Sequence, residues 1–314
     1  MSSKVAIKIE SEPAKSTAKP VVNFRRKLLA TNSSNEVNEP RKVIVDLDAG
    51  TNDAMALLML LAADSRCNIR LLGVTCVHGN TAVDNVCINV LRVLGTVGRF
   101  DVLVYRGAEE ALIQATPQTN HQFHGADGFG EVKFPHTPNL KLLQPEHAVV
   151  ALNRITSYPN HHKGMGNTTS AAEFNFHSDP EAAFIVLNRA QCPITILPWE
   201  TCVNTKITFD WRFQVLGGIH NPHMDLMNAI ERPLYEKANL SHWMPCDALL
   251  SAVVLDSQVT TKCHSCHMTV ELHGHFTRGQ AIVDHLEENE PNVTVVDQLD
   301  VALFKRLLIE AVSM

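Results

Sequence analysis

The chain has 314 residues, 45% of them hydrophobic and 19% charged, which is enough to bury a large core in one or two globular domains. Its formal net charge of -6 argues against nucleic acid as a main partner, because no basic surface is implied. No apolar run reaches the length of a membrane span and no signal peptide is recognisable. Most of the eight cysteines stand singly in apolar segments, so we expect a cytoplasmic protein with reduced thiols and no membrane partner.

Residues 1–40 are expected to form a disordered N-terminal tail. They are rich in Ser, Lys, Glu, Asn and Pro and show no sustained hydrophobic periodicity. Residues 41–314 contain no internal repeat and no convincing domain linker. We therefore expect a single domain over this second range.

Strands and helices are expected to alternate from residue 42 onward. The expected elements are strands at 42–48, 69–77 and 101–107 and helices at 53–64 and 82–98. Further helices are expected at 146–158, 179–191, 246–256 and 301–312, and further strands at 193–199 and 268–274. This alternation predicts an α/β fold, a single domain with a mainly parallel sheet flanked by helices and Rossmann-like right-handed crossovers.

The strongest functional signal is a group of acids where the first strand ends. Asp46, Asp48 and Asp53 stand within eight positions, and ligands of parallel sheets bind beyond the carboxyl ends of the strands. Two strand-end acids followed by one in the first helical turn supply hard oxygen ligands for Ca²⁺ or Mg²⁺. Helix capping is the simpler explanation, but it needs one carboxylate rather than three. The pattern therefore favours a metal or sugar site.

A second polar segment lies at 166–183. Its polar residues alternate with phenylalanine: Asn167, Glu173 and Asn175 with Phe174 and Phe176. This mixture suits a site that holds hydroxyl groups beside an apolar wall. Taken alone, however, the segment is better explained as an irregular loop that leads into the next helix. Asp247 also opens an expected helix, and by itself it is better explained as a capping residue.

Together these residues resemble the inosine-uridine preferring nucleoside hydrolase family. The family opens with the motif Asp-x-Asp-x-Gly-x-Asp-Asp, and residues 46–53 read Asp-Leu-Asp-Ala-Gly-Thr-Asn-Asp here. Further motifs follow in the family's order: a His-Gly-Asn turn at 78–80, HGADG at 124–128, the segment at 166–183, Asp247 and TRG at 277–279. The resemblance extends over residues 42–312.

The resemblance implies hydrolysis of the N-glycosidic bond of a ribonucleoside, which gives ribose and a free base, with Ca²⁺ as cofactor. By motif position, Asp48 corresponds to the metal-ligating general base that deprotonates the attacking water, and Asp53 and Asp247 correspond to further metal ligands. The residues implied to bind the substrate are Asn52, Asn80, Asn167, Glu173, Phe174 and Asn175. Members of this family are often dimers or tetramers, so a homo-oligomer is implied as well.

Three features depart from the family pattern. Asn52 stands where the family has an Asp, which keeps a hydrogen-bonding side chain but loses a charge. Cys246 stands where many members have a His that assists the departing base. Between 158 and 166, roughly 30 residues are absent, about one strand-loop-helix unit. Because the resemblance implies that this unit supplies a strand and a backbone carbonyl ligand, we expect lower stability and weak or absent hydrolysis.

Two other functions are consistent with parts of the sequence. A non-catalytic relative that binds a nucleoside or ribose would explain Asn52 and the missing unit, whereas the retained acids oppose it. A phosphatase of the haloacid dehalogenase type is suggested by VIVDLDAGT, but in that family the Thr stands two places after the second Asp, and Thr51 stands three after Asp48. The sequence does not determine which base is preferred, because base contacts come from variable loops.

Overall fold

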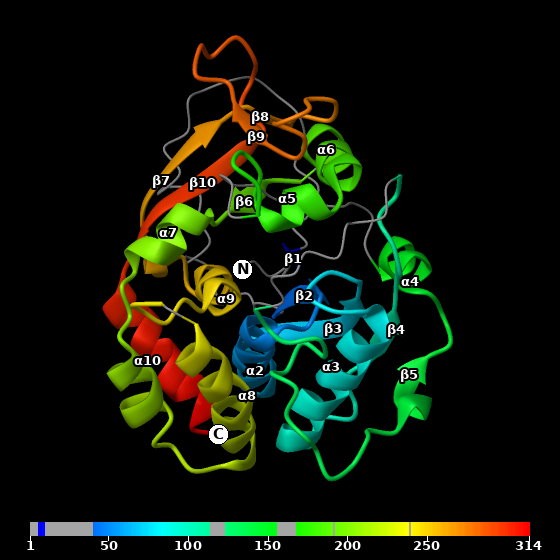
Figure 1. Cartoon of the computed structure of the whole chain (residues 1–314), viewed down its shortest axis with the longest axis vertical. Helices are drawn as coiled ribbons and strands as arrows, with labels where there is room; N and C mark the ends of the chain where they lie inside the picture. The colour runs from blue at the N-terminus through cyan, green and yellow to red at the C-terminus, as the bar shows by residue number, and fades with distance from the viewer. Residues whose placement is uncertain (1–5, 10–39, 114–122, 156–167, 191, 239) are drawn as a thin grey trace, which may run out of the picture.

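The structure is a computed structural model that describes residues 6–9, 40–113, 123–155, 168–190, 192–238 and 240–314 (Figure 1). Its first sheet has the strand order β1 (Ala6–Ile9), β2 (Arg41–Leu47), β3 (Ile69–Cys76), β4 (Val104–Arg106) and β5 (Leu143–Gln144). Strands β2 to β5 run parallel, as predicted, and β1 pairs with the other edge of β2 in the antiparallel direction. The α/β class and the mainly parallel sheet are therefore confirmed.

The helices that connect these strands are buried to different degrees. α2 (Thr51–Ser65) is apolar on nearly every side and residues 51–63 are all buried, as expected of a helix inside a core. α3 (Val83–Val97) is amphipathic and packs one apolar face inward. It ends at Gly98, whose φ of 68° lies in the left-handed region that glycine adopts without a steric penalty.

A second sheet follows later in the chain. β6 (Ile194–Ile196) pairs in parallel with β10 (Val293–Leu299), which pairs in the antiparallel direction with β7 (Thr260–Cys266). β8 (Met268–Val270) and β9 (Ala281–Val283) form a separate antiparallel pair, so the strand expected at 268–274 is shorter than predicted. Among the described residues, no strand links the first sheet to the second.

The remaining helices cover both sheets (Figure 1). They are α4 (Ala148–Ile155), α5 (Phe174–Ser178), α6 (Pro180–Arg189), α7 (Trp199–Asn204), α8 (Pro222–Lys237), α9 (Cys246–Leu255) and α10 (Val301–Val312), with 3-10 turns at Leu140–Leu142 and Ser257–Val259 and a π-helix at Trp211–Leu216. The expected helix at 146–158 is α4, and residues 156–158 lie outside the described ranges. The sequence analysis did not predict α8, which carries Pro233 in its interior.

Two hydrophobic cores hold these layers together. α2 lies at the centre of the larger core, where α8, α9 and α10 pack against it. The smaller core lies between the second sheet and helices α5 and α6, and includes Phe176, Leu187, Ile196 and Met268. Of the helices in the described ranges, none has both the length and the apolar character needed to cross a membrane.

Candidate active site

Asp48 follows β2 directly and is fully buried. Its Oδ2 accepts a hydrogen bond from the backbone N–H of Asn80 at 2.9 Å, and its Oδ1 accepts one from Asn80 Nδ2 at 3.0 Å. The contact follows from the parallel pairing of β2 with β3, in which Leu47 lies opposite Cys76, so that the loops after both strands meet. Gly79 is required in the second loop, because a Cβ at this position would collide with the Asp48 carboxylate.

Asp53 lies in the first turn of α2 and is also fully buried. Its Oδ2 accepts hydrogen bonds from the Gly50 N–H at 2.9 Å and from Asn80 Nδ2 at 3.5 Å, so the Asn80 amide bridges two carboxylates. Within the described ranges, Asp53 Oδ1 has no hydrogen-bond partner. Burial and the nearby charges of Asp247 and Asp48 raise the pKa of Asp53 well above its ordinary value. The site therefore disfavours the anionic form of Asp53 and would favour a cation.

Asp247 comes from a distant part of the chain. It is buried in the first turn of α9, which packs against α2, and its charge acts on Asp53. Asn80 therefore links Asp48 to Asp53, and the charge of Asp247 acts on Asp53. These three residues, Asp48, Asp53 and Asp247, are called the acidic cluster below, and their convergence on one pocket stays a prediction. Asp46 accepts a hydrogen bond from Thr75 Oγ1 on β3 at 2.6 Å, and its place in the cluster stays a prediction.

The start of α2 also brings His124 to the site. The backbone N–H of Thr51 donates to His124 Nδ1 at 3.2 Å, so this nitrogen carries no proton and the ring proton lies on Nε2. His124 Nε2 is buried without a hydrogen-bond partner among the described residues. Burial lowers the pKa of His124 to about 3, so the ring is neutral at physiological pH. The ring is thus a neutral N–H donor beside the acidic cluster.

The sequence analysis assigned no role to His124. The residue belongs to the HGADG segment, which we used only for the family resemblance. His124 and Asn80 both pack closely against Gly50. A Cβ added to Gly50 would lie 2.9 Å from His124 Cδ2 and 2.8 Å from Asn80 Nδ2. Asn52 is buried in the same first turn of α2, and its Oδ1 also has no hydrogen-bond partner in the part of the chain that the structure describes.

The second polar segment serves the local fold at least in part. Glu173 is buried and caps α5, because its Oε2 accepts hydrogen bonds from the N–H groups of Asn175 at 3.0 Å and Phe176 at 3.4 Å. Phe174 and Asn175 are half-buried in the first turn of this helix. Asn167 lies outside the described residues, so its expected role in the site stays a prediction.

Two cysteines connect this segment to the acidic cluster. The Cys246 thiol donates to the carbonyl oxygen of Met244 at 3.7 Å at the start of α9. A hydrogen bond with Cys246, burial and the charges of Asp247 and Glu173 all raise the pKa of the Cys202 thiol. Both carboxylates therefore act on one buried thiol, and the meeting of the two halves of the expected site stays a prediction.

The chemistry of the acidic cluster fits a divalent cation. Its three side chains offer carboxylate oxygens, the ligands that Ca²⁺ prefers, and a buried oxygen of Asp53 is left without a hydrogen bond from any described residue. Over the described ranges, no three His, Cys, Asp or Glu side chains are already spaced as ligands of one ion. Asn80 bridges Asp48 and Asp53, so its amide would have to move for an ion to bind both carboxylates.

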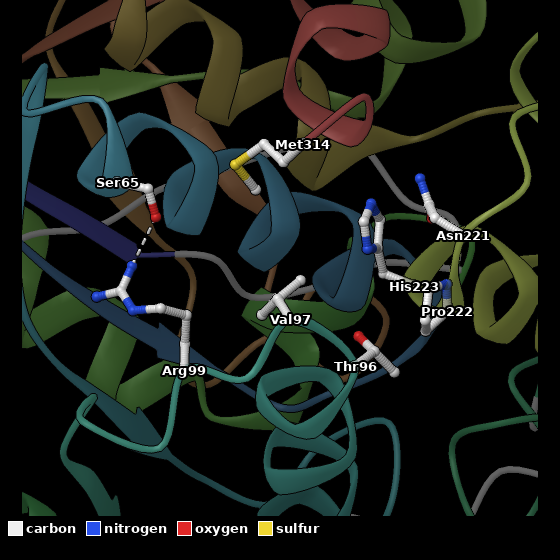
Figure 2. A pocket seen from close by; sticks show the side chains of 8 residues that line it. All are labelled: Ser65, Thr96, Val97, Arg99, Asn221, Pro222, His223 and Met314. Atoms are coloured by element: carbon white, nitrogen blue, oxygen red, sulfur yellow. Dashed lines mark hydrogen bonds between the residues drawn. The ribbon is translucent and has the colours of Figure 1, made fainter.

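A cavity of about 400 Å³ lies away from these acids. Figure 2 shows the residues that line it: Ser65, Thr96, Val97, Arg99, Asn221, Pro222, His223 and Met314. Ser65 ends α2, whereas the acidic cluster lies at the start of this helix, about 22 Å away along its fifteen residues. Arg99 donates to Ser65 Oγ at 2.9 Å, and His223 Nε2 lies 2.9 Å from the carbonyl oxygen of Val312. The cavity is therefore separate from the candidate active site.

Comparison with known proteins finds relatives along most of the chain. A sequence profile described as inosine-uridine preferring nucleoside hydrolase matches residues 43–165 and 161–306. The inosine-uridine preferring nucleoside hydrolase of Leishmania major is 27% identical over 317 positions, covering 87% of this chain and 98% of that protein. The pyrimidine-specific ribonucleoside hydrolase RihA of an Enterobacter species is 28% identical over 312 positions, covering 86% and 97%. A solved inosine-guanosine nucleoside hydrolase has a TM-score of 0.78 and 23% identity, covering 86% of this chain and 98% of that one.

The alignments with these relatives contain positions that have no counterpart in this chain. The Leishmania major alignment has 317 positions but includes 87% of 314 residues, or about 273, so about 44 positions have no counterpart here. The Enterobacter alignment has 312 positions and includes 86% of the chain, or about 270 residues, which leaves about 42. The family profile matches the chain in two parts, residues 43–165 and 161–306, which overlap at 161–165. The break between the two parts lies in the region where the sequence predicted a gap.

Proposed function

The chain belongs to the inosine-uridine preferring nucleoside hydrolase family, and on this basis we propose that it hydrolyses the N-glycosidic bond of ribonucleosides to ribose and free base. The observation that supports the proposal is the buried pair of carboxylates Asp48 and Asp53, which share the amide of Asn80, together with the charge of Asp247 that acts on Asp53. Burial of several carboxylates side by side destabilises a fold unless a ligand compensates their charge. The family membership favours this reaction over the phosphatase alternative.

Asp48 is the general base of the proposed reaction. A water molecule loses a proton to Asp48 while its oxygen forms a bond to C1′ of the ribose. The C1′–N bond breaks, its electron pair moves to the base, and the base takes up a proton. Asn80 binds both oxygens of Asp48 and so positions this carboxylate. The remaining negative charge of the acidic cluster stabilises the positive charge that develops on the sugar in the transition state.

The ribose would lie between Asn80 and the segment at the start of α5. We place its hydroxyl groups against Asn80, Glu173 and Asn175, with Phe174 as the apolar wall and Asn52 and Asn167 as further contacts. Support comes from the buried Oδ1 of Asn52, which has no described hydrogen-bond partner and can accept a hydroxyl proton. Such contacts favour ribose over deoxyribose, because a missing hydroxyl leaves buried polar atoms unpaired.

We propose Ca²⁺ as the metal, held by the acidic cluster. When bound, the ion would offset the repulsion between the carboxylates and make the attacking water more acidic. The missing segment removes the backbone carbonyl that the family resemblance implies as a further ligand. We therefore expect weaker ion binding and slower hydrolysis than in the longer relatives. All eight cysteines are thiols, which fits the proposed cytoplasmic location.

The release of base from nucleosides tests this proposal. The purified full chain is incubated with inosine, uridine or 2′-deoxyinosine in the presence of Ca²⁺, and products are separated by chromatography. We expect base and ribose in equal amounts from the ribonucleosides, more slowly than with the Leishmania major relative in parallel. The alternative, a non-catalytic nucleoside-binding protein, is favoured by Asn52 and the missing segment. It predicts binding of inosine by calorimetry without release of base.

A further inference from the structure

Strand β2 has a neighbour on each side, and the two neighbours come from different parts of the chain. β3 pairs with it in parallel, in the order expected of an α/β fold. On the other edge, β1 pairs with β2 in the antiparallel direction, with Ala6 opposite Asp46 and Ile9 opposite Val43. The second neighbour therefore comes from the N-terminal segment that the sequence analysis assigned to a disordered tail.

The missing segment would lie at the junction between the two sheets. The gap in the family match falls at 161–165, after α4 and before α5. Every strand before the gap belongs to the first sheet, and every later strand of the described ranges belongs to the second sheet or to the β8–β9 pair. A gap of about one strand-loop-helix unit is long enough to remove one strand from between them. Without β1, the first sheet has two outer edges, at β2 and at β5, and β1 covers the one at β2.

An uncovered edge would be costly at this position. Val43, Ile44 and Val45 of β2 are almost completely buried in the chain with β1 in place. Buried backbone groups without a hydrogen bond are strongly unfavourable, and an unpaired strand edge also recruits other chains. The antiparallel pairing with β1 provides partners to this edge within the same chain.

We propose that Ala6–Ile9 is a built-in replacement strand, which covers the β2 edge in place of the segment that this chain lacks. The sequence of this segment, Ala-Ile-Lys-Ile, has the β-branched content of a strand. At four residues, β1 is short, and a short strand limits further pairing at its outer edge. The proposal concerns folding and does not depend on the proposed function.

Hydrogen exchange of β2 tests the replacement strand. We compare the full chain with a variant that lacks residues 2–10 and with Ile7→Pro, in which proline removes a backbone donor from β1. The expected result is at least about a tenfold loss of amide protection in the peptide that covers 41–47, without loss in the β10 peptide. Ser16→Pro, outside β1, is the matched control and should leave both peptides unchanged.

A synthetic peptide of residues 1–12 keeps the test decisive if the deletion variant folds poorly. Added during refolding, this peptide should restore the protection of β2, whereas a scrambled peptide of the same composition should not. Dimerisation of the deletion variant also supports the proposal, because a second copy then pairs with the open edge. Equal protection of residues 41–47 in the full chain, the deletion variant and Ile7→Pro, with all three monomeric, would overturn it.

Discussion

Two groups of fully buried charged residues differ in how their charge is compensated. In the first group, Arg212 Nε donates to Glu231 Oε2 at 2.6 Å, and neither side chain is exposed. Arg212 Nη1 also donates to Asn228 Oδ1 at 2.9 Å, and Trp243 Nε1 donates to Glu231 Oε1 at 3.3 Å. Burial raises the pKa of Glu231, and the adjacent guanidinium of Arg212 opposes this rise. This group holds its cation and anion within the fold.

The acidic cluster has a different composition. Its carboxylates receive hydrogen bonds from the neutral amides of Asn80 and Gly50, and the pKa of Asp53 is raised by burial and by two further carboxylates. A buried ion pair that is complete within the chain can be explained by structure alone. A buried group of like charges has no such partner within the group, and for this reason we propose a functional role for the acidic cluster and a structural role for the Arg212–Glu231 pair.

Substitution of Asp48 should have the largest effect on function. Asp48→Asn keeps the shape of the side chain but removes the proton acceptor, so kcat for inosine should fall by about 10²- to 10⁴-fold. Circular dichroism should show an unchanged fold. The matched control is Asp84→Asn, which removes an exposed carboxylate that pairs with Arg106. Equal activity of Asp48→Asn and Asp84→Asn would show that Asp48 is no more important for hydrolysis than an exposed acid.

Substitution of Arg212 should have the largest effect on stability. Arg212→Met leaves Glu231 as a buried, uncompensated charge, so the free energy of unfolding should fall by about 3–5 kcal/mol. The measurement is urea unfolding, with Arg106→Met as control, because an exposed pair contributes about 0–1 kcal/mol. A decrease in the free energy of unfolding of less than about 1 kcal/mol for Arg212→Met would mean that the buried Arg212–Glu231 pair does not stabilise the fold as proposed.

Substitution of Asn175 should separate binding from stability. Asn175→Ala removes a polar side chain that we place against the ribose, so KM for inosine should rise by about tenfold or more, which corresponds to about 1–3 kcal/mol. Asn188→Ala on the neighbouring α6, where the amide donates to the Phe184 carbonyl oxygen, is the control. The assignment of Asn175 to the ribose is wrong if both variants change KM equally. It is also wrong if Asn175→Ala lowers the melting temperature enough for unfolding to explain the change in KM.

A further prediction concerns the pH dependence of stability at His124. Burial lowers its pKa in the native state to about 3, below the value of about 6.5 in the unfolded chain. The stability that the neutral ring contributes is therefore complete above pH 6.5 and is lost as the pH falls toward 3, by at most about 1.4 kcal/mol per pH unit. His124→Asn should flatten the dependence of the unfolding free energy on pH between pH 6.5 and 5, as measured by urea unfolding at each pH.

The approach of Asp48 to Asp53 could be predicted from sequence because this geometry is local. A strand that ends at Leu47 and a helix that begins at Thr51 confine Asp48 and Asp53 to one short turn. Parallel pairing then brings Asn80 to the same edge. Asp247 lies nearly two hundred positions away, and only the motif order of the family pointed to it.

Other features depend on contacts that the sequence does not reveal. Arg212 and Glu231 are nineteen positions apart and have the appearance of surface charges, and only the packing of α8 buries them. His124 acquires its role from a hydrogen bond to the start of α2. The pairing of β1 with β2 depends on which strands are absent elsewhere, so no local pattern in Ala6–Ile9 could have predicted it.

The most direct test of the account is the melting temperature as a function of Ca²⁺ concentration. Wild-type protein, Asp53→Asn and Arg106→Met are compared, with NaCl matched for ionic strength. We predict a melting temperature that rises steadily with Ca²⁺ concentration for the wild type and for Arg106→Met, with a stabilisation of about 2.7 kcal/mol at a hundredfold excess over Kd. Asp53→Asn should lose this rise in melting temperature. A wild-type melting temperature that does not change with Ca²⁺, or an equal rise in Asp53→Asn, would contradict the assignment of the acidic cluster as a cation site.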